Sequence, residues 1–269
     1  MFPLRDNVGL KRFPIVTVAI VLINVVAYLL EIRHGGSFLG GPTDSVAVHY
    51  GAIPYELTHP GKHCALLTAH GAQGAYAAVA CQGLPAAGGG ALAGPAPAQP
   101  ATALTLITSM FLHGSFLHIF GNMVFLAVFG PTVEDRLGRL RFPVFYLLGG
   151  LVALGAQVAA APASTAPTLG ASGAIAAVLG AYVVLHPRAR VITLVFIIFF
   201  FTIVEVPAVL LLGFWFLEQL YLGASGLASP IGGGEGVAYF AHIGGFLFGA
   251  LSVAVLARRG AAAPRMPVY

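Results

Sequence analysis

The chain has 269 residues, of which 58% are hydrophobic and only 8% are charged, and its mean hydropathy is +0.90. Soluble domains carry about 25% charged residues, so this composition excludes an ordinary soluble protein and indicates an all-α polytopic membrane protein. The formal net charge of +4 leaves two roles for the basic residues, which are binding of nucleic acid and control of membrane topology.

Six apolar runs predict six membrane-spanning helices, near residues 14–31, 114–132, 142–161, 172–185, 191–212 and 238–257. An even number of spans puts both termini on one side of the membrane. Eleven of the thirteen Lys and Arg residues fall on that side: Arg5, Lys11, Arg12, Arg136, Arg139, Arg141, Arg188, Arg190, Arg258, Arg259 and Arg265. The positive-inside rule therefore predicts cytoplasmic termini, and basic charge sets the topology without forming a nucleic-acid patch.

The spans define the domain organisation. We expect a cytoplasmic segment at residues 1–13, a membrane domain at 14–257 that includes a long external loop at 32–101, and a cytoplasmic tail at 258–269. The first apolar run is long enough to span, and no small-residue cleavage site follows it, so it is interpreted as a signal anchor. The expected location is the bacterial plasma membrane.

The external loop is the least predictable part of the chain. From Gly71 to Ala101 it is rich in Ala, Gly and Pro, and we expect it to be poorly ordered or to lie on the membrane surface. Both cysteines, Cys64 and Cys81, fall in this loop, where a disulfide and two free thiols are both open alternatives.

Polar side chains interrupt the second apolar run. His118 and Asn122 are four residues apart and share a helix face, and His113 precedes them. Such groups are either hydrogen-bonding contacts between helices or parts of a functional site. At the inner end of this helix, Glu134 and Arg136 are expected to fix a charged turn, which is a structural role.

The fourth run is unusually short. From Ser172 to Leu185 it would be about 21 Å long as a helix, against a hydrocarbon core of about 30 Å. His186-Pro187-Arg188 holds its inner end at the membrane surface, so Ser172 is expected about 9 Å below the outer surface. Ser172 would then sit at a helix N-terminus, where free backbone N–H groups favour a developing oxyanion.

The sixth run carries one histidine into the membrane. His242, Gly245 and Gly249 lie on one helical stripe. Small-residue stripes let two helices approach closely, so this stripe is expected to pack on the fourth helix and bring His242 to Ser172.

Three further features precede the sixth run. Glu205 is expected within the fifth span, as a functional group or the partner of a local contact. Trp215 is interpreted as an interface aromatic at the outer end of that span. The Gly-rich loop at 223–237 is a candidate lid.

Taken together, these segments resemble the rhomboid family of intramembrane serine proteases, over about residues 105–257 and the first helix. The resemblance implies a six-helix bundle with a short, submerged fourth helix, in which Ser172 is the nucleophile and His242 the general base. It implies an oxyanion hole from His118, Asn122 and the Ser172 N–H, shaped by Gly170. Structural support is implied for His113, Glu134, Arg136, Gly173, Gly245 and Gly249.

The implied reaction is hydrolysis of a peptide bond in or near the transmembrane segment of a membrane-protein substrate. The implied partners are this substrate and the membrane lipids, and no metal or cofactor is implied. The reaction requires no more than a monomer. Two features depart from many family members. The only tryptophan is Trp215, so the Trp-Arg pair of the first outer loop is missing, and Ala176 replaces a tyrosine that stacks under the base.

Two other interpretations stay open. One is a catalytically silent rhomboid-like scaffold, and the other is a metal-dependent membrane protein that uses His113, His118 and His242. An ordinary serine hydrolase is discarded, because its nucleophile motif has a second glycine where this chain has Ala174, and no soluble α/β pattern surrounds it.

Overall fold

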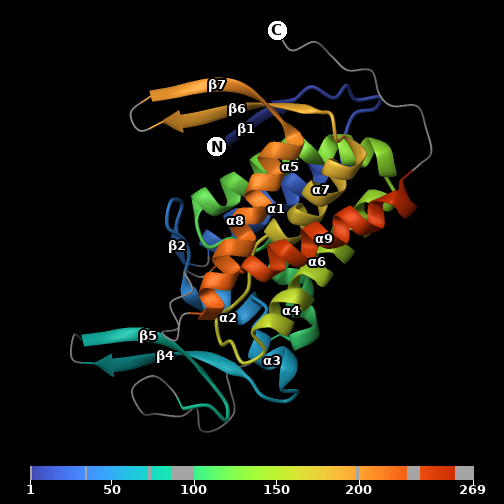
Figure 1. The fold of residues 1–269 in the computed structure, drawn as a ribbon. Coiled ribbons are helices and arrows are strands. Elements are labelled where there is room, and N and C mark those ends of the chain that lie inside the picture. Colours follow the sequence, from blue (N-terminus) through green and yellow to red (C-terminus); the bar gives the residue numbers. More distant parts are fainter. Residues whose placement is uncertain are drawn as a thin grey trace.

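The computed structural model describes residues 2–33, 35–71, 74–85, 100–197, 200–228 and 237–257. This part of the chain is mostly helical (Figure 1). Five of its helices are long and apolar enough to cross a membrane: α1 (Ile15–Arg33), α5 (Phe116–Leu137), α6 (Arg141–Ala160), α8 (Ala208–Ala228) and α9 (Tyr239–Leu256). The shorter apolar α7 (Ser172–Leu185) completes the bundle. The expected helical membrane fold is therefore confirmed.

Helix α7 is the centre of the bundle. It contacts α5, α6, α8 and α9, and every residue from Gly173 to Tyr182 is buried. Small residues dominate this stretch, which lets neighbouring backbones approach from several sides. The helix begins and ends at the predicted residues, so the short fourth helix is confirmed.

The α7–α9 interface is the most extensive helix contact in the described residues. A Cβ atom at Gly245 would collide with the carbonyl oxygen of Gly173, and one at Gly249 with that of Ala177. Only glycine allows the two backbones to lie this close. The predicted glycine stripe of α9 is thus the surface that seats this helix on α7.

The predicted span at 191–212 is wrong. Its first part forms the antiparallel strands β6 (Arg190–Ile197) and β7 (Phe200–Pro207), and only then does α8 begin. Strand β1 (Phe2–Asp6), which lies in the segment expected as a simple cytoplasmic lead, pairs with β6 to give a sheet of order β1-β6-β7. The run is rich in Val, Ile, Phe and Thr, which favour a strand, whereas mean hydropathy cannot distinguish a strand from a helix.

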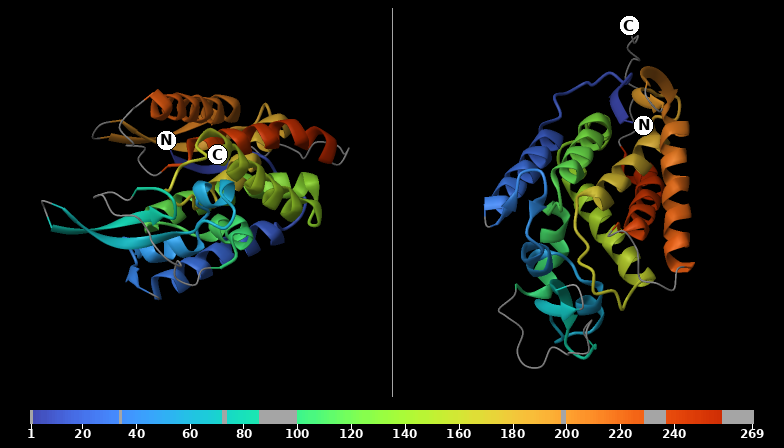
Figure 2. Two further views of the ribbon diagram at one scale, coloured as in Figure 1. Left: turned by 90° about the horizontal axis from the view of Figure 1, so that it is seen from below. Right: turned by 90° about the vertical axis from the view of Figure 1, so that its left-hand side faces the viewer.

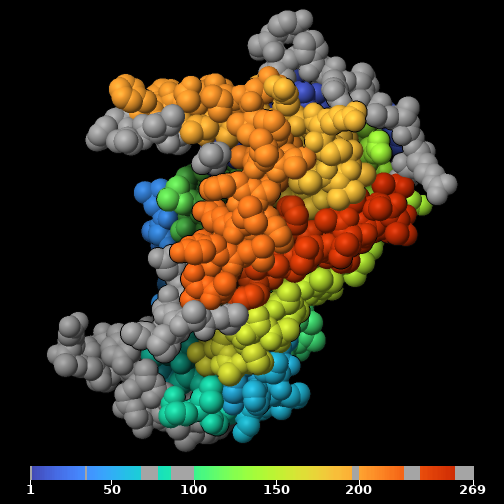
Figure 3. All heavy atoms as spheres, viewed as in Figure 1, coloured from blue at the N-terminus to red at the C-terminus, as the bar shows by residue number. Residues whose placement is uncertain are grey.

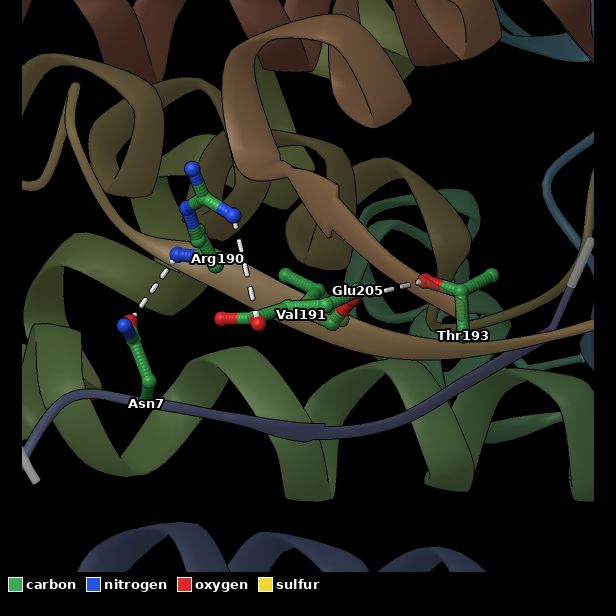
Figure 4. Close-up of polar contacts among 5 residues, drawn as sticks. All are labelled: Asn7, Arg190, Val191, Thr193 and Glu205. Carbon is green, nitrogen blue, oxygen red and sulfur yellow. Dashed lines mark hydrogen bonds and ion pairs between the residues drawn. The ribbon is translucent and has the colours of Figure 1, made fainter. Parts of the chain in front are cut away.

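Glu205 therefore lies in a strand and not in a membrane-spanning helix. Its carboxylate is 3.9 Å from the Arg190 guanidinium across the β6–β7 pair (Figure 4). The Arg190 backbone N–H donates to the side chain of Asn7, 2.9 Å away, which ties the sheet to the N-terminal segment. The alternative of a local structural partner is the one observed.

The β6–β7 hairpin projects from the bundle beside the end of α8 (Figure 3). Its apolar side chains Phe200, Phe201 and Ile203 are 79%, 72% and 59% exposed. Strands β4 (Cys64–Gly71) and β5 (Gly74–Cys81), by contrast, lie at the opposite end of the bundle (Figures 1 and 2).

The loop expected at 32–101 contains short elements: β2 (Gly36–Ser37), β3 (Gly41–Pro42), α2 (Asp44–Tyr50), α3 (Pro54–Thr58), β4 (Cys64–Gly71) and β5 (Gly74–Cys81). Helix α4 (Thr102–Thr108) and the 3-10 turn η1 (Ser109–Phe111) follow it and lead to α5. The β4–β5 hairpin corrects the expectation of poor order from Gly71 onward, while residues 86–99 lie outside the described part. Cys64 and Cys81 face each other across the hairpin and form a disulfide.

Candidate active site

Ser172 and His242 are joined by a hydrogen bond. The distance from Ser172 Oγ to His242 Nε2 is 2.8 Å, although the two residues are 70 positions apart in the chain. Ser172 is the first residue of α7, and His242 lies in the first turn of α9. The close packing of α7 on α9 therefore brings together the two side chains for which the sequence predicts a nucleophile and a base.

Hydrogen-bond donors lie beside this pair. The Asn122 side-chain nitrogen is buried without a partner among the described residues, and a buried donor of this kind is costly unless it serves a ligand or a transition state. His118 lies one turn earlier on α5. Ser115 caps the start of this helix, because the Ser115 hydroxyl accepts a hydrogen bond from the His118 backbone N–H at 3.2 Å. The Ser172 backbone N–H is one of the free donors of a helix N-terminus.

Gly170 brings the loop before α7 against His118. Its φ of +120° is a conformation that L side chains rarely adopt, and a Cβ atom here would lie 2.8 Å from His118 Nε2. The Gly170 N–H donates to the Ser109 carbonyl at 2.8 Å, which ties the loop to η1. Gly170 therefore shapes the predicted oxyanion site through its backbone.

His113 stands behind His118. It is completely buried, its backbone N–H donates to Glu31 Oε2 at 3.2 Å, and its ring centroid is 5.1 Å from that of His118. These contacts fit the structural role that the sequence suggested. Gly173 packs equally tightly, because an added Cβ would lie 2.7 Å from the Ala153 side chain on α6.

Glu134 and Arg136 lie at the inner end of α5, away from Ser172. Glu134 accepts hydrogen bonds from the backbone N–H groups of Val16 at 3.0 Å and Thr17 at 2.7 Å, and from the Thr17 hydroxyl. It thus caps the N-terminus of α1, where free donors and the helix dipole favour an anion. Arg136 Nε is buried with no hydrogen-bond partner among the described residues, and the expected turn is fixed through Glu134.

A cavity of about 660 Å³ opens onto the serine and the histidine. Its polar wall carries Ser172, His242, His118 and Asn122, while most of the remaining lining is apolar. The site is a concave apolar pocket with a few convergent polar groups, which is the usual form of a binding or active site. Residues 229–236 of the expected lid lie outside the described residues.

Comparison with known families matches the Rhomboid domain over residues 100–259, which is more than half of the chain. The chain belongs to the rhomboid family. Among its relatives, Rhomboid protein 1, mitochondrial, of Saccharomyces cerevisiae is 34% identical over 154 residues, which are 55% of this chain and 40% of that protein. Presenilin-associated rhomboid-like protein A, mitochondrial, of Danio rerio is 31% identical over 155 residues, which are 57% and 37% of the two chains.

The match thus spans about two fifths of the length of these relatives. Their names place them in mitochondria, and they give no support to the expected bacterial plasma membrane. That this rhomboid is a multi-pass membrane protein follows from the family together with its long apolar helices.

This rhomboid supports its histidine from α8 and not from α7. Ala176, where many members have a tyrosine, offers no ring, but Gln219 Oε1 lies 2.7 Å from His242 Nδ1. The Trp215 ring centroid is 5.7 Å from that of His242, so Trp215 lies beside the histidine and not at the end of a span. Sequence reasoning missed Gln219, although its spacing of four from Trp215 in an apolar run marks a shared helix face.

Proposed function

We propose that this rhomboid is an intramembrane serine endopeptidase that hydrolyses a peptide bond in or near the transmembrane segment of membrane-protein substrates. The observation that carries the proposal is the 2.8 Å hydrogen bond between Ser172 Oγ and His242 Nε2 at the wall of a cavity. A nucleophile within hydrogen-bond reach of a base is the requirement for covalent acyl transfer.

The reaction would start with attack of Ser172 Oγ on the substrate carbonyl carbon, as the hydroxyl proton moves to His242 Nε2. The carbonyl oxygen becomes an oxyanion that accepts hydrogen bonds from Asn122, His118 and the Ser172 N–H. His242 then gives its proton to the leaving amine, and the C–N bond breaks. Water then attacks the acyl-enzyme as its proton moves to His242 Nε2, and the bond from the acyl carbon to Ser172 Oγ breaks. His242 returns this proton to Ser172 Oγ, and the carboxylic acid product leaves.

The substrate class follows from the setting of the site. The cavity lies within a helical membrane bundle and is mostly apolar, so it suits the unwound end of a substrate helix better than a soluble peptide. Gly near the scissile bond would ease this unwinding, because it has poor helix propensity. The partners proposed are therefore single-span membrane proteins and the surrounding lipid.

The scaffold alternative receives no specific support, since Ser172 and His242 are both present and in contact. The metal-dependent alternative needs His113, His118 and His242 as a ligand set. Among the described residues no three His, Cys, Asp or Glu side chains gather in an arrangement that could hold a metal ion.

Cleavage of a single-span reporter with a Gly/Ala-rich outer end tests the proposal. Ser172→Ala and His242→Asn should each lower the turnover by about 10⁴-fold or more, and a chelator should change nothing. Ser252→Ala is the matched control, because this serine lies on α9 and bonds only the Phe248 carbonyl. A fluorophosphonate should label the parent and not Ser172→Ala. Cleavage that survives Ser172→Ala would refute the assignment.

A further inference from the structure

His242 is held through both of its ring nitrogens. Nε2 is 2.8 Å from Ser172 Oγ, and Nδ1 is 2.7 Å from Gln219 Oε1. Gln219 comes from the inward face of α8 and is only 5% exposed. Its neighbour Glu218 is exposed, and no carboxylate among the described residues bonds to His242. The third group of this site is therefore a neutral amide.

The position of the imidazole proton decides whether His242 acts as a base. A neutral imidazole carries its proton on one nitrogen, and the other nitrogen is the acceptor. Nε2 can take the Ser172 proton only when the proton of the neutral ring resides on Nδ1. An acceptor fixed at Nδ1 favours this tautomer, and Gln219 Oε1 is such an acceptor.

The orientation of the ring needs support as well. Ala176 on α7 has no ring to place against His242, whereas Trp215 lies one turn before Gln219 on α8. The Trp215 ring also packs against Phe246 of α9, with the centroids 6.2 Å apart. Helix α8 thus offers both an aromatic ring and a hydrogen-bond acceptor to the imidazole.

We propose that Gln219 is the positioning residue of this rhomboid, which holds His242 in the tautomer and orientation that can accept the proton of Ser172. The inference rests on the proposed function and deepens it. Gln219 does not touch the substrate, and it acts only through the histidine. As His242 becomes an imidazolium with a proton on each nitrogen, Gln219 Oε1 keeps the Nδ1–H bond while Nε2–H passes its proton to the leaving amine.

Two substitutions separate this role from simple packing. Gln219→Met keeps the length of the side chain and removes the oxygen acceptor, whereas Gln219→Glu keeps an acceptor and adds charge. Gln157→Met on α6 is the matched control for loss of an amide in a membrane helix. The side chain of Gln157 is not part of the wall of the 660 Å³ cavity. It also takes no part in the hydrogen bond between Ser172 and His242.

The readouts are kcat and KM on the reporter, the rate of fluorophosphonate labelling, and the pH profile of kcat/KM. Gln219→Met should lower kcat and labelling by about 10- to 100-fold, because a buried N–H is left without its partner, with KM changed less than about twofold. Gln219→Glu should recover most of the rate at high pH. In this variant the acid limb of the kcat/KM profile should move to higher pH by about one unit or more, since a carboxylate raises the pKa of the base.

Another ionisable side chain beside His242 should not produce this shift of the pH profile. Among the described residues that line the cavity beside His242, the other titratable side chain is His118 of α5, and it is the same in both variants. A variant that elutes as a single species in detergent with the parental melting temperature counts as folded. If Gln219→Met does not fold, the pH profile of Gln219→Glu tests the proposal, and an unchanged profile overturns it.

The inference is overturned if folded Gln219→Met keeps kcat within about twofold of the parent. It is also overturned if Met and Glu lose activity equally and leave the pH profile unchanged, because the side chain would then act by packing alone. Ser172→Ala keeps this failure distinct from failure of the proposed function. If that variant is inactive while Gln219→Met is normal, the serine mechanism stands without the positioning residue.

Discussion

At the scale of single residues, the site depends on positions where no side chain fits. Gly170 brings its backbone to His118, and Gly245 and Gly249 bring α9 to α7. Catalytic geometry is sensitive to displacements of about 1 Å, which can cost about 10²-fold in rate. The glycines therefore contribute to reactivity by fixing the distances between the polar groups that they bring together.

Gly170→Ala should slow the reaction while leaving the protein folded. The new methyl group would meet His118 Nε2, and the φ of +120° would be strained, so the predicted oxyanion donors should move. We expect a fall in kcat of about 10²-fold, measured on the membrane-protein reporter at equal expression. Gly155→Ala is the control, because a Cβ on this α6 glycine meets open space. Parental turnover of Gly170→Ala would contradict the role given to this glycine.

At the scale of elements, the sequence predicts helices well where polar or small residues mark them. The bounds of α7 followed from Gly170 before it and His186-Pro187 after it, which are clear start and stop signals. The 191–212 run offered only hydropathy, which a buried helix and an apolar strand share. Its β-branched residues and Pro207, which ends β7, were the signals for a hairpin followed by a new helix.

The error in this one element hid part of the site. A fifth span that ends at residue 212 predicts Trp215 at the membrane interface and predicts no role for Gln219. Helix α8 instead begins at Ala208 and carries both side chains to His242. Ser172, His242, His118 and Asn122 were predictable because their residue types and spacing are specific, whereas Gln219 becomes visible only once the packing of α8 on α9 is known.

The β1-β6-β7 sheet is attached to the bundle by a titrating contact. The Tyr182 hydroxyl of α7 donates to Asp6 Oδ2 at 2.8 Å, and burial raises the pKa of Asp6 from its usual value of 3.8 to about 6. Because the folded-state pKa is the higher one, protonated Asp6 stabilises the fold below pH 4. This contribution is lost as the pH rises through 6.

Asp6→Asn should abolish this pH dependence. Asn keeps an acceptor for the Tyr182 hydroxyl and cannot ionise. The variant should match the parent near pH 4 and exceed it near pH 7 by about 1 to 3 kcal/mol in unfolding free energy, measured as melting temperature in detergent across this range. Equal slopes for variant and parent would show that Asp6 does not titrate in this way. Asp44→Asn, at an exposed residue of α2, controls for the loss of a carboxylate.

At the scale of the whole molecule, the two ends of the bundle differ in chemistry. The end that carries the β1-β6-β7 sheet holds most of the basic residues, whereas the other end holds the β4–β5 hairpin and the Cys64–Cys81 disulfide (Figure 1). Basic charge predicts a cytoplasmic face, and a disulfide indicates an oxidising compartment. Two independent physical arguments therefore predict the same orientation, in which Ser172 would lie nearer the outer face.

The cysteines allow both arguments to be tested at once. They are the only two in the chain and both are buried, so a maleimide added to the denatured protein should label the parent only after reduction. For the orientation, Lys62→Cys at an exposed position, placed in the Cys64→Ala/Cys81→Ala background, should be labelled by a membrane-impermeant maleimide added to intact cells. Labelling that requires permeabilised membranes would reverse the orientation, and labelling of the unreduced parent would exclude the disulfide.

The disulfide should also stabilise the outer end, where Val48, Ile53 and Tyr55 pack against both cysteines in a small cluster of their own. A link over a sequence separation of 17 residues stabilises a fold by about 3 kcal/mol in the chain-entropy model. The double variant Cys64→Ala/Cys81→Ala should therefore melt at a lower temperature while its membrane helices stay packed. A retained fluorophosphonate labelling rate at low temperature would show that the disulfide stabilises the outer end without forming the site. Loss of labelling in a folded double variant would instead mean that the outer end holds Ser172 and His242 in place.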